Sequence, residues 1–322
     1  MSFLREVGFA APVTLALMPL IHAGYAAWVR RQHPAKGVRF THAGVPVHYV
    51  KTGSGPAVVL VHGANGTSGD FPPELISDLA RDHTVIVLDR PGHGWSEAPR
   101  GPLGLEQNAA TVLALVRELD ARPATIVGHS YGAAVALRAA LDAPEDVSQV
   151  VAVCPCTALD ERNARYGSLP LMSGPVGATL LRFFALPMVP FGWALRADAW
   201  YPAPAPRGWG ESRVFAYIPS QMHTAVRNFN RLGTDVTWLQ EHLPGLKVPL
   251  TVVAGAQDLV TPPDRHVDWL RRAVPAARIQ IVPRVGHWLP RLTPEFVSAA
   301  VRGRPNLQPA RLGTQSEASP SR

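Results

Sequence analysis

The chain has 322 residues, of which 47% are hydrophobic and 17% are charged, and its formal net charge is +7. This composition is typical of a globular protein with an apolar excess and excludes an intrinsically disordered chain. The positive charge comes almost wholly from arginines dispersed along the sequence, since the only lysines are Lys36, Lys51 and Lys247. Dispersed arginine without a nucleic-acid-binding motif favours attraction to anionic membrane surfaces and predicts no nucleic-acid partner.

An uncharged segment, GFAAPVTLALMPLIHAGYAAWV, occupies residues 8–29. It is long enough to cross a hydrocarbon core as a helix, so we predict that residues 1–36 form a single hydrophobic anchor that binds membrane lipid. Arg30, Arg31 and Lys36 follow directly and favour a cytoplasmic position for the rest of the chain. Two alternatives stay open: a cleaved signal peptide, which would give a secreted or periplasmic form, and a hydrophobic helix packed on the domain.

A rhythm of strands and helices begins at residue 37. Residues 38–51 are typical of a hairpin around Ala43 and Gly44. Short apolar runs, typical of strands buried on both faces of a parallel sheet, occur at 57–63, 83–89, 124–130, 148–154, 248–255 and 277–283. Apolar residues at helical spacing predict helices over 105–120 and 262–274. The alternation predicts a mostly parallel, doubly wound α/β sheet built from residues 37–155 and 247–303.

This rhythm stops between residues 156 and 246, which we interpret as an inserted helical cap. The segment 169–195 is rich in proline and contains one charged residue, Arg182. The prolines favour short helices that form an apolar lid over the alternative of a second membrane span. Residues 304–322 are polar and predict a disordered C-terminal tail.

A serine lies between two glycines in TIVGHSYGAAVAL, residues 125–137. Strand-forming residues precede Ser130, and an alanine-rich, helix-forming run follows it. Gly128 and Gly132 lack the Cβ atoms that would clash in a sharp strand-to-helix turn. Such a turn exposes the hydroxyl and directs helix N–H groups toward it, which suits a nucleophile whose reaction develops negative charge.

A nucleophilic serine needs a base and an acid that orients the base, and candidates for both follow late strands. His287 lies in IVPRVGHWLP and Asp258 lies in VVAGAQDLVTPP, each just after a predicted strand. Parallel strands bring these loops and the Ser130 turn to the same carboxyl edge of the sheet. Asp160 and Asp235 are alternative acids, although neither follows a clear strand.

The motifs VLVHGANG, GHSYG, LDRPGHGWS, AGAQDLVTPP and VGHW together resemble the α/β-hydrolase fold family. The similarity is to its cap-bearing branch, which is related to epoxide hydrolases, haloalkane dehalogenases and cofactor-free haloperoxidases. The resemblance covers residues 37–302 and is weakest in the cap. It implies a catalytic triad of Ser130, Asp258 and His287.

The resemblance also implies an oxyanion hole made of two backbone N–H groups. One belongs to Ala64, which follows the early His-Gly pair, and the other to Tyr131, which follows the nucleophile. Epoxide hydrolases and dehalogenases carry aspartate at the strand-to-helix turn, whereas this chain carries Ser130. The implied intermediate is therefore an acyl-enzyme and not an alkyl-enzyme ester.

No cofactor or metal site is predicted. The chain has neither an H-E-x-x-H spacing nor a G-x-G-x-x-G motif that opens a helix after a first strand. Cys154 and Cys156 are separated by one residue, which suits small residues at the end of a buried strand better than a disulfide or a metal pair. His62 and His129 are interpreted as loop supports and His93 as a turn residue.

The sequence as a whole predicts a membrane-associated serine hydrolase acting on a carboxylic ester of a moderately to strongly apolar small molecule or lipid. Two alternatives stay open. The same triad could perform carbon–carbon bond hydrolysis, acyl transfer or perhydrolysis, or the fold could serve a non-catalytic ligand-binding protein. No obligate protein partner is evident from the sequence.

Overall fold

The computed structural model describes residues 2–159, 170–185, 201–202 and 214–304. Its centre is an eight-stranded sheet in the order β1-β2-β4-β3-β5-β6-β7-β8. The hairpin strands β1 and β2 pair antiparallel with each other and β2 with β4, and all other pairs are parallel. The strands are β1 (Val38–His42), β2 (Val45–Gly53), β3 (Ala57–Val61), β4 (Thr84–Leu88), β5 (Ala124–His129), β6 (Val147–Val153), β7 (Leu250–Gly255) and β8 (Arg278–Val282).

The predicted hairpin and every predicted strand are confirmed, and their predicted first and last residues differ from the observed ones by no more than two positions. The hairpin turns at Ala43 and Gly44, whose φ angles of 48° and 74° lie in the left-handed region. Such a turn matches the twist of the two strands that it joins. The chain therefore adopts the mostly parallel α/β sheet that the alternation of apolar runs predicts.

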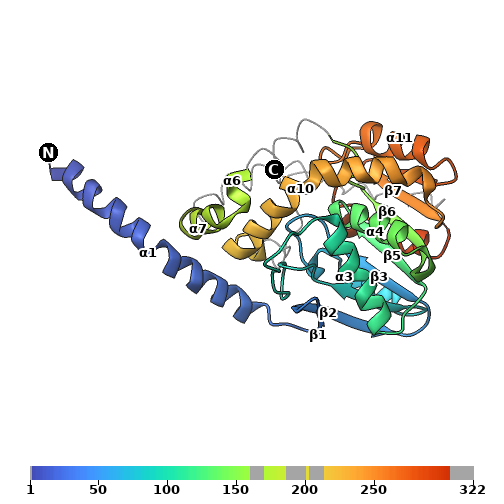
Figure 1. The fold of residues 1–322 in the computed structure, drawn as a ribbon, viewed down its shortest axis with the longest axis horizontal. Helices are drawn as coiled ribbons and strands as arrows, with labels where there is room; N and C mark the ends of the chain where they lie inside the picture. Colours follow the sequence, from blue (N-terminus) through green and yellow to red (C-terminus); the bar gives the residue numbers. More distant parts are fainter. Residues whose placement is uncertain (1, 160–169, 186–200, 203–213, 305–322) are drawn as a thin grey trace, which may run out of the picture.

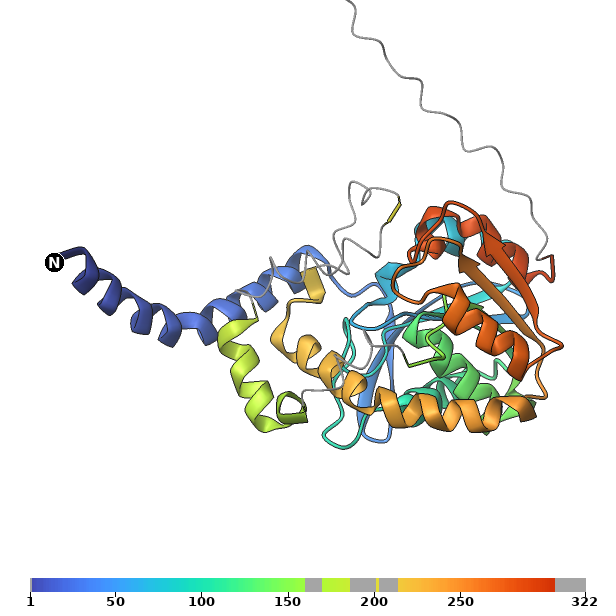
Figure 2. The same ribbon diagram turned by 90° about the horizontal axis from the view of Figure 1, so that it is seen from above.

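Helices cover both faces of this sheet, as Figure 1 and Figure 2 show. Alternate residues of β3 divide between two cores, because successive strand side chains point to opposite faces. Val59 and Val61 pack with α3 (Leu105–Glu118), α4 (Tyr131–Asp142) and α11 (Pro263–Ala273). Val58 and Leu60 pack on the other face with α2 (Pro73–Leu79) and α13 (Pro294–Val301), which follows the short α12 (Leu289–Leu292).

The insertion between β6 and β7 contains α6 (Pro170–Ser173), α7 (Pro175–Phe184) and α10 (Pro219–His242). Residues 160–169, 186–200 and 203–213 of the predicted cap lie outside the described residues, as does the tail at 305–322. Helix α10 contacts α6 and α7 and also α3 and α4. Its second half places Leu232, Val236 and Leu239 in the main core. One long amphipathic helix thus packs the insertion into the core of the α/β domain, while the boundaries of the insertion at 156 and 246 stay predictions.

The predicted N-terminal hydrophobic helix is present as α1 (Ser2–Gln32). Its first part projects away from the body of the molecule, and its last part lies beside the insertion (Figure 2). There His22 and Val29 are buried, so this part matches the alternative of a hydrophobic helix packed on the domain. None of the helices that the structure describes combines the length and apolar character needed to cross a membrane. The membrane anchor over residues 8–29 stays a prediction.

Helix α4 begins so close to β3 that its second residue has no room for a side chain. A Cβ atom at Gly132 would lie 2.2 Å from the carbonyl oxygen of Val61 and 2.6 Å from that of His62. Both oxygens belong to backbone that is fixed in the sheet or directly after it. Glycine at this position therefore sets the distance between the helix and the sheet.

We expect Gly132→Ala to destabilise the fold by about 3 kcal/mol or more, because overpacked backbone cannot move aside cheaply. The matched control is Gly233→Ala in α10, where a Cβ would meet no atom within 4 Å. That substitution should stabilise the helix by up to about 1 kcal/mol. Urea unfolding measures both effects, and equal unfolding midpoints for the two variants would contradict the packing argument.

Candidate active site

Ser130 occupies a strained turn between β5 and α4. Its φ of 56° and ψ of −118° lie outside the regions that residues with a side chain ordinarily adopt. Three backbone hydrogen bonds hold the turn: Ser130 N–H donates to Val153 O at 2.9 Å, and Ser130 O accepts from the N–H groups of Ala133 at 3.0 Å and Cys156 at 3.2 Å. The side chain is 8% exposed, at the carboxyl edge of the sheet where the sequence places it.

The first glycine of the motif permits this turn. A Cβ atom at Gly128 would lie 2.2 Å from Gly132 O, across the bend. The two glycines thus contact each other's backbone, and the chain can reverse within the residues between them. The expected role of the glycine pair in the turn is confirmed.

Asp258 and His287 form a hydrogen-bonded pair in the loops after β7 and β8. His287 Nδ1 lies 2.8 Å from Asp258 Oδ2, and both residues are buried. Burial alone would raise the pKa of Asp258, but the charge of His287 and hydrogen bonds from His287 and Thr261 outweigh it and lower that pKa. An ionised carboxylate only accepts, so Nδ1 carries the proton and a neutral His287 has its Nε2 lone pair available.

Thr261 is a member of this site that the sequence reasoning did not identify. Its N–H donates to Asp258 Oδ1 at 2.9 Å, as does the N–H of Val260 at 2.8 Å. Its hydroxyl lies 2.8 Å from Asp258 Oδ2 and 3.0 Å from Cys154 O. The bond from the N–H of Val260, two residues after Asp258, is the turn that aspartate commonly forms with its own backbone. The carboxylate is held on both oxygens and cannot rotate away from His287.

Ser130 lies close to the Asp258–His287 pair because the residue before it, His129, contacts His287. His129 Nε2 lies 2.9 Å from His287 O, and the centroids of the two imidazole rings are 4.8 Å apart. The Ser130 hydroxyl itself makes no hydrogen bond within the part of the chain that the structure describes. Catalytic hydrogen bonds are often open in ligand-free structures and close when substrate binds.

The alternative acids fall elsewhere. Asp235 lies in α10, where its carboxylate accepts the N–H of Leu105 at 2.9 Å and caps α3. It therefore belongs to the attachment of the insertion and not to the histidine site. Asp160 lies outside the described residues.

A buried arginine, also not identified from the sequence, holds the loop that contains Ala64. Arg90 donates from Nε to His62 O at 3.1 Å and from NH2 to Gly63 O at 2.9 Å. Its guanidinium carbon lies 4.7 Å from the centroid of the Tyr131 ring. Burial lowers the pKa of Arg90 to about 10, so the side chain stays a cation at neutral pH. One cation thus contacts the backbone that precedes Ala64 and the side chain of Tyr131, the two residues whose N–H groups are the candidate oxyanion donors.

The same guanidinium reaches two helices. Its NH1 donates to Asn108 Oδ1 of α3 at 3.1 Å and to Asn228 Oδ1 of α10 at 3.0 Å. His62 supports the same loop, because its Nδ1 lies 2.9 Å from Gly63 O and its Nε2 accepts the Arg90 N–H at 2.9 Å. Burial holds the pKa of His62 well below its usual range, so this ring is neutral. The interpretation of His62 and His129 as loop supports is confirmed.

Three buried side chains that can bind metals lie together near the turn. The donor atoms of His129, Cys154 and His287 are all within 4.8 Å of one another. Burial raises the pKa of Cys154 well above its usual range, with a further contribution from the charge of Asp258. The thiolate, not the thiol, is the metal ligand, and His287 already serves Asp258. We interpret the group as packing around His287.

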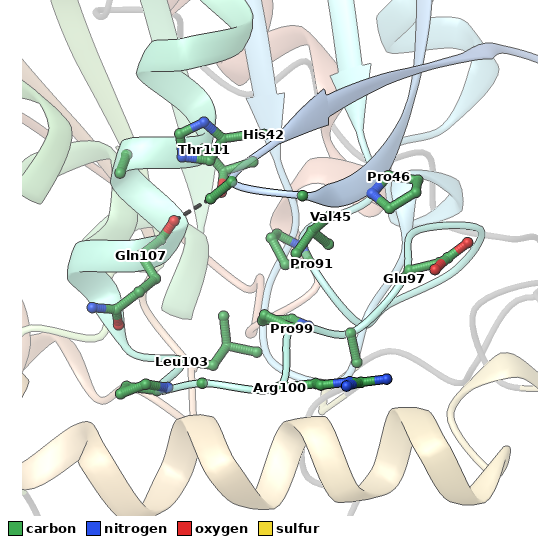
Figure 3. A pocket seen from close by; sticks show the side chains of 16 residues that line it. His42, Val45, Pro46, Pro91, Glu97, Pro99, Arg100, Leu103, Gln107 and Thr111 are labelled. Carbon is green, nitrogen blue, oxygen red and sulfur yellow. Dashed lines mark hydrogen bonds between the residues drawn. The ribbon is translucent and has the colours of Figure 1, made fainter.

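A cavity of about 660 Å³ lies between the β1–β2 hairpin and the loop at 97–103 (Figure 3). Its lining mixes apolar and polar side chains, among them His42, Pro46, Arg100, Leu103 and Thr111. Neither Ser130, Asp258 nor His287 is one of its lining residues. This cavity is therefore separate from the candidate active site.

Comparisons with known proteins place this geometry in a family. The model of the alpha/beta hydrolase fold matches residues 56–290. An uncharacterized protein of Mycobacterium tuberculosis is 28% identical over 249 residues, which cover 73% of this chain and 71% of that protein. A pimeloyl-acyl-carrier-protein methyl ester esterase of Xylella fastidiosa is 38% identical over 106 residues, 33% of this chain and 39% of the esterase.

Solved structures agree. The 2-hydroxy-6-oxo-6-phenylhexa-2,4-dienoate hydrolase of a Rhodococcus species superposes with a TM-score of 0.69 at 24% identity, covering 83% of this chain and 97% of that enzyme. An epoxide hydrolase superposes with a TM-score of 0.68 at 22% identity over 83% of this chain and 97% of that one. The family match spans strands β3 to β8, the Ser130 turn and the His287 loop. The chain therefore belongs to the α/β-hydrolase fold family.

Proposed function

We propose that the chain is a serine hydrolase that cleaves a carboxylic ester of a moderately to strongly apolar small molecule or lipid through an acyl-enzyme. The observation that carries the proposal is the buried Asp258–His287 hydrogen bond beside a serine in a strained turn. These residue types at one sheet edge are what acyl transfer requires. Serine in place of aspartate at the turn distinguishes the proposal from epoxide hydrolysis.

In the proposed reaction, Ser130 Oγ attacks the ester carbonyl carbon while its proton passes to His287 Nε2. The backbone N–H groups of Ala64 and Tyr131 stabilise the resulting oxyanion, and Asp258 stabilises the imidazolium. His287 then returns the proton to the alcohol oxygen as the carbon–oxygen bond breaks. A water molecule, activated by the same imidazole, releases the acid and restores Ser130.

Two further observations support an apolar ester as the substrate. The insertion that follows β6 contributes apolar sequence, with Arg182 the one charged residue in 169–195. The Xylella fastidiosa relative is, by its name, a methyl ester esterase, and it shares 38% identity with this chain over 106 residues. Ester cleavage needs no residue beyond those already at the site.

We expect Ser130→Ala to lower kcat by about a millionfold, since a triad without its nucleophile retains only binding and oxyanion stabilisation. The assay is hydrolysis of 4-nitrophenyl esters of graded chain length, together with labelling by a fluorophosphonate probe. Wild type should be labelled at Ser130 and the variant should not. A variant that keeps more than a few per cent of the wild-type rate would overturn the assignment, and an unlabelled wild type would favour a binding protein.

We expect Asp258→Asn to lower kcat roughly ten-thousandfold, because an amide no longer fixes the imidazole tautomer. Asp235→Asn is the matched control, since Asp235 is also buried but caps α3. Circular dichroism measures the folded fraction of this variant, and its kcat per folded molecule should stay near the wild-type value. A silent Asp258→Asn together with a crippling Asp160→Asn would assign the role of the acid to Asp160.

We expect Arg90→Lys to lower kcat more than it changes KM, because an ammonium cannot reproduce the two-pronged contact that holds the loop of Ala64. The loss of buried hydrogen bonds should also destabilise the fold by about 2–4 kcal/mol. Arg138→Lys is the control, because Arg138 also stacks on an aromatic ring, that of Trp238 at 3.7 Å, but far from the turn. Equal kcat values for the two variants would show that Arg90 serves stability alone.

A further inference from the structure

Helix α1 has two apolar faces, and only one of them contacts the domain. The inner face carries the buried His22 and Val29, with Tyr25 and Ala26 partly buried beside them. The outer face carries side chains that are 44–70% exposed: Leu17, Leu20, Ile21 and Trp28. At 100° per residue these four fall within an arc of about 100°. A helix that serves only the domain's core would carry polar residues on this outer face.

Contacts at the end of α1 fix which face points outward. Val29 packs with Phe215 and Ile218, and the Tyr25 hydroxyl donates to Val214 O at 2.8 Å. After the helix, Trp95 Nε1 donates to His33 O at 3.1 Å. The helix therefore cannot roll its outer face onto this domain without breaking these contacts.

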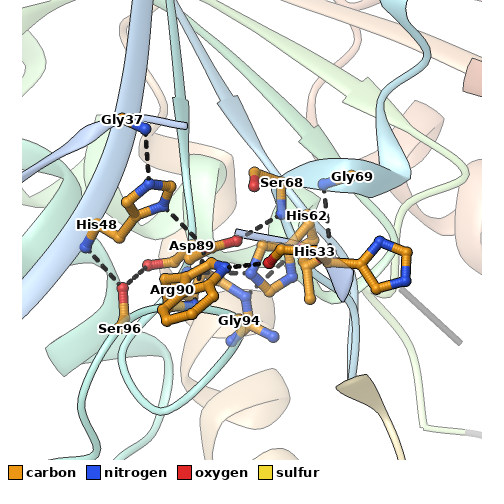
Figure 4. A network of polar contacts seen from close by, with 12 residues as sticks. His33, Gly37, His48, His62, Ser68, Gly69, Asp89, Arg90, Gly94 and Ser96 are labelled. Atoms are coloured by element: carbon orange, nitrogen blue, oxygen red, sulfur yellow. Dashed lines mark hydrogen bonds and ion pairs between the residues drawn. The ribbon is translucent and has the colours of Figure 1, made fainter. Parts of the chain in front are cut away.

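The connection into the sheet is also held by a buried polar network, which Figure 4 shows. Gly37 N–H donates to His48 Nε2 at 3.1 Å, and His48 Nδ1 lies 2.9 Å from Asp89 Oδ2. Asp89 in turn accepts the N–H groups of Ser68 at 2.6 Å and Trp95 at 3.0 Å. The segment after α1 is thus anchored to the same loop that Trp95 belongs to.

Helix α7 of the insertion lies in contact with α1 and also exposes an apolar stripe. Its inner residues, Gly177, Leu181 and Ala185, are buried. Its outer residues follow a spacing of four and are 37–51% exposed: Val176, Leu180 and Phe184. We call these three residues, together with Leu17, Leu20, Ile21 and Trp28, the docking face.

The two segments that carry the docking face contain basic residues but no acidic ones. Residues 16–36 and 170–185 contain no aspartate or glutamate. Arg31 lies on the same arc of α1 as the outer apolar side chains, and Arg182 is exposed on α7. Apolar helix faces rimmed by arginine and tryptophan suit the boundary between headgroups and acyl chains, where anionic headgroups attract the cations.

We propose that the docking face binds the surface of an anionic phospholipid membrane, to which both α1 and α7 contribute side chains. A second copy of the chain fits less well, because a two-fold contact through this face would bring like-charged arginines together. The proposal does not depend on the hydrolytic activity. It also assigns α7 a membrane contact, which an anchor made of α1 alone does not require.

The test uses the full-length chain, synthesised cell-free with vesicles and recovered by flotation. The vesicles consist of phosphatidylcholine, with or without about 30 mol% of the anionic lipid phosphatidylglycerol. We expect Phe184→Glu to reduce binding to anionic vesicles at least tenfold, because it removes an exposed aromatic side chain that the membrane would bury and adds a charge that anionic headgroups repel. Ile281→Glu is the control: Ile281 is similarly exposed, at 38%, but lies on β8. It should bind like wild type.

A second variant tests the charge. Arg182→Gln should weaken binding to anionic vesicles about fivefold and leave binding to pure phosphatidylcholine unchanged, since one surface cation contributes about 1 kcal/mol. Wild-type binding by Phe184→Glu would overturn the role of α7 and leave α1 as the sole attachment. A dimer that Phe184→Glu dissociates without loss of vesicle binding would show that the face joins two copies instead.

Discussion

The buried guanidinium of Arg90 is the interaction on which the site most depends. A charged side chain is costly to bury, and here neutral oxygens from separate elements accept hydrogen bonds from it: His62 O, Gly63 O, Asn108 Oδ1 and Asn228 Oδ1. The Tyr131 ring adds a favourable face for the cation. Arg90 therefore contacts four parts of the fold: the loop after β3, the start of α4, helix α3 and the long helix of the insertion. None of them can shift without leaving part of the cation unsatisfied.

Much of the fold could be predicted because its signals are local. Runs such as 57–61 and 84–88 are apolar throughout, and only strands buried on both faces need that pattern. The Ser130 turn was recognisable because both flanking glycines are required by contacts within the turn itself and with β3. Asp258 and His287 could be paired across 29 positions of sequence because each follows a parallel strand, and such strands end at one edge.

What could not be predicted depends on partners that are distant in the sequence. Nothing adjacent to Arg90 indicates that Asn228 accepts from it across 138 positions. Asp235 was predicted as an alternative acid for the histidine, whereas its carboxylate accepts the backbone N–H of Leu105. The uncharged segment 8–29 fits a membrane span by composition alone, yet His22 and Val29 are buried against the protein. His22 tolerates this because its Nδ1 lies 2.8 Å from Met18 O within the same helix.

The placement of charge around Ser130 matches the charge separation of the proposed reaction. Burial lowers the pKa of His129 to about 3 and holds that of His93 well below its usual range, so these neighbouring rings stay neutral. The cation of Arg90 lies against the Tyr131 ring, and the anion of Asp258 is hydrogen-bonded to His287, where the imidazolium would form. A fixed charge of the right sign stabilises a transition state without reorganising.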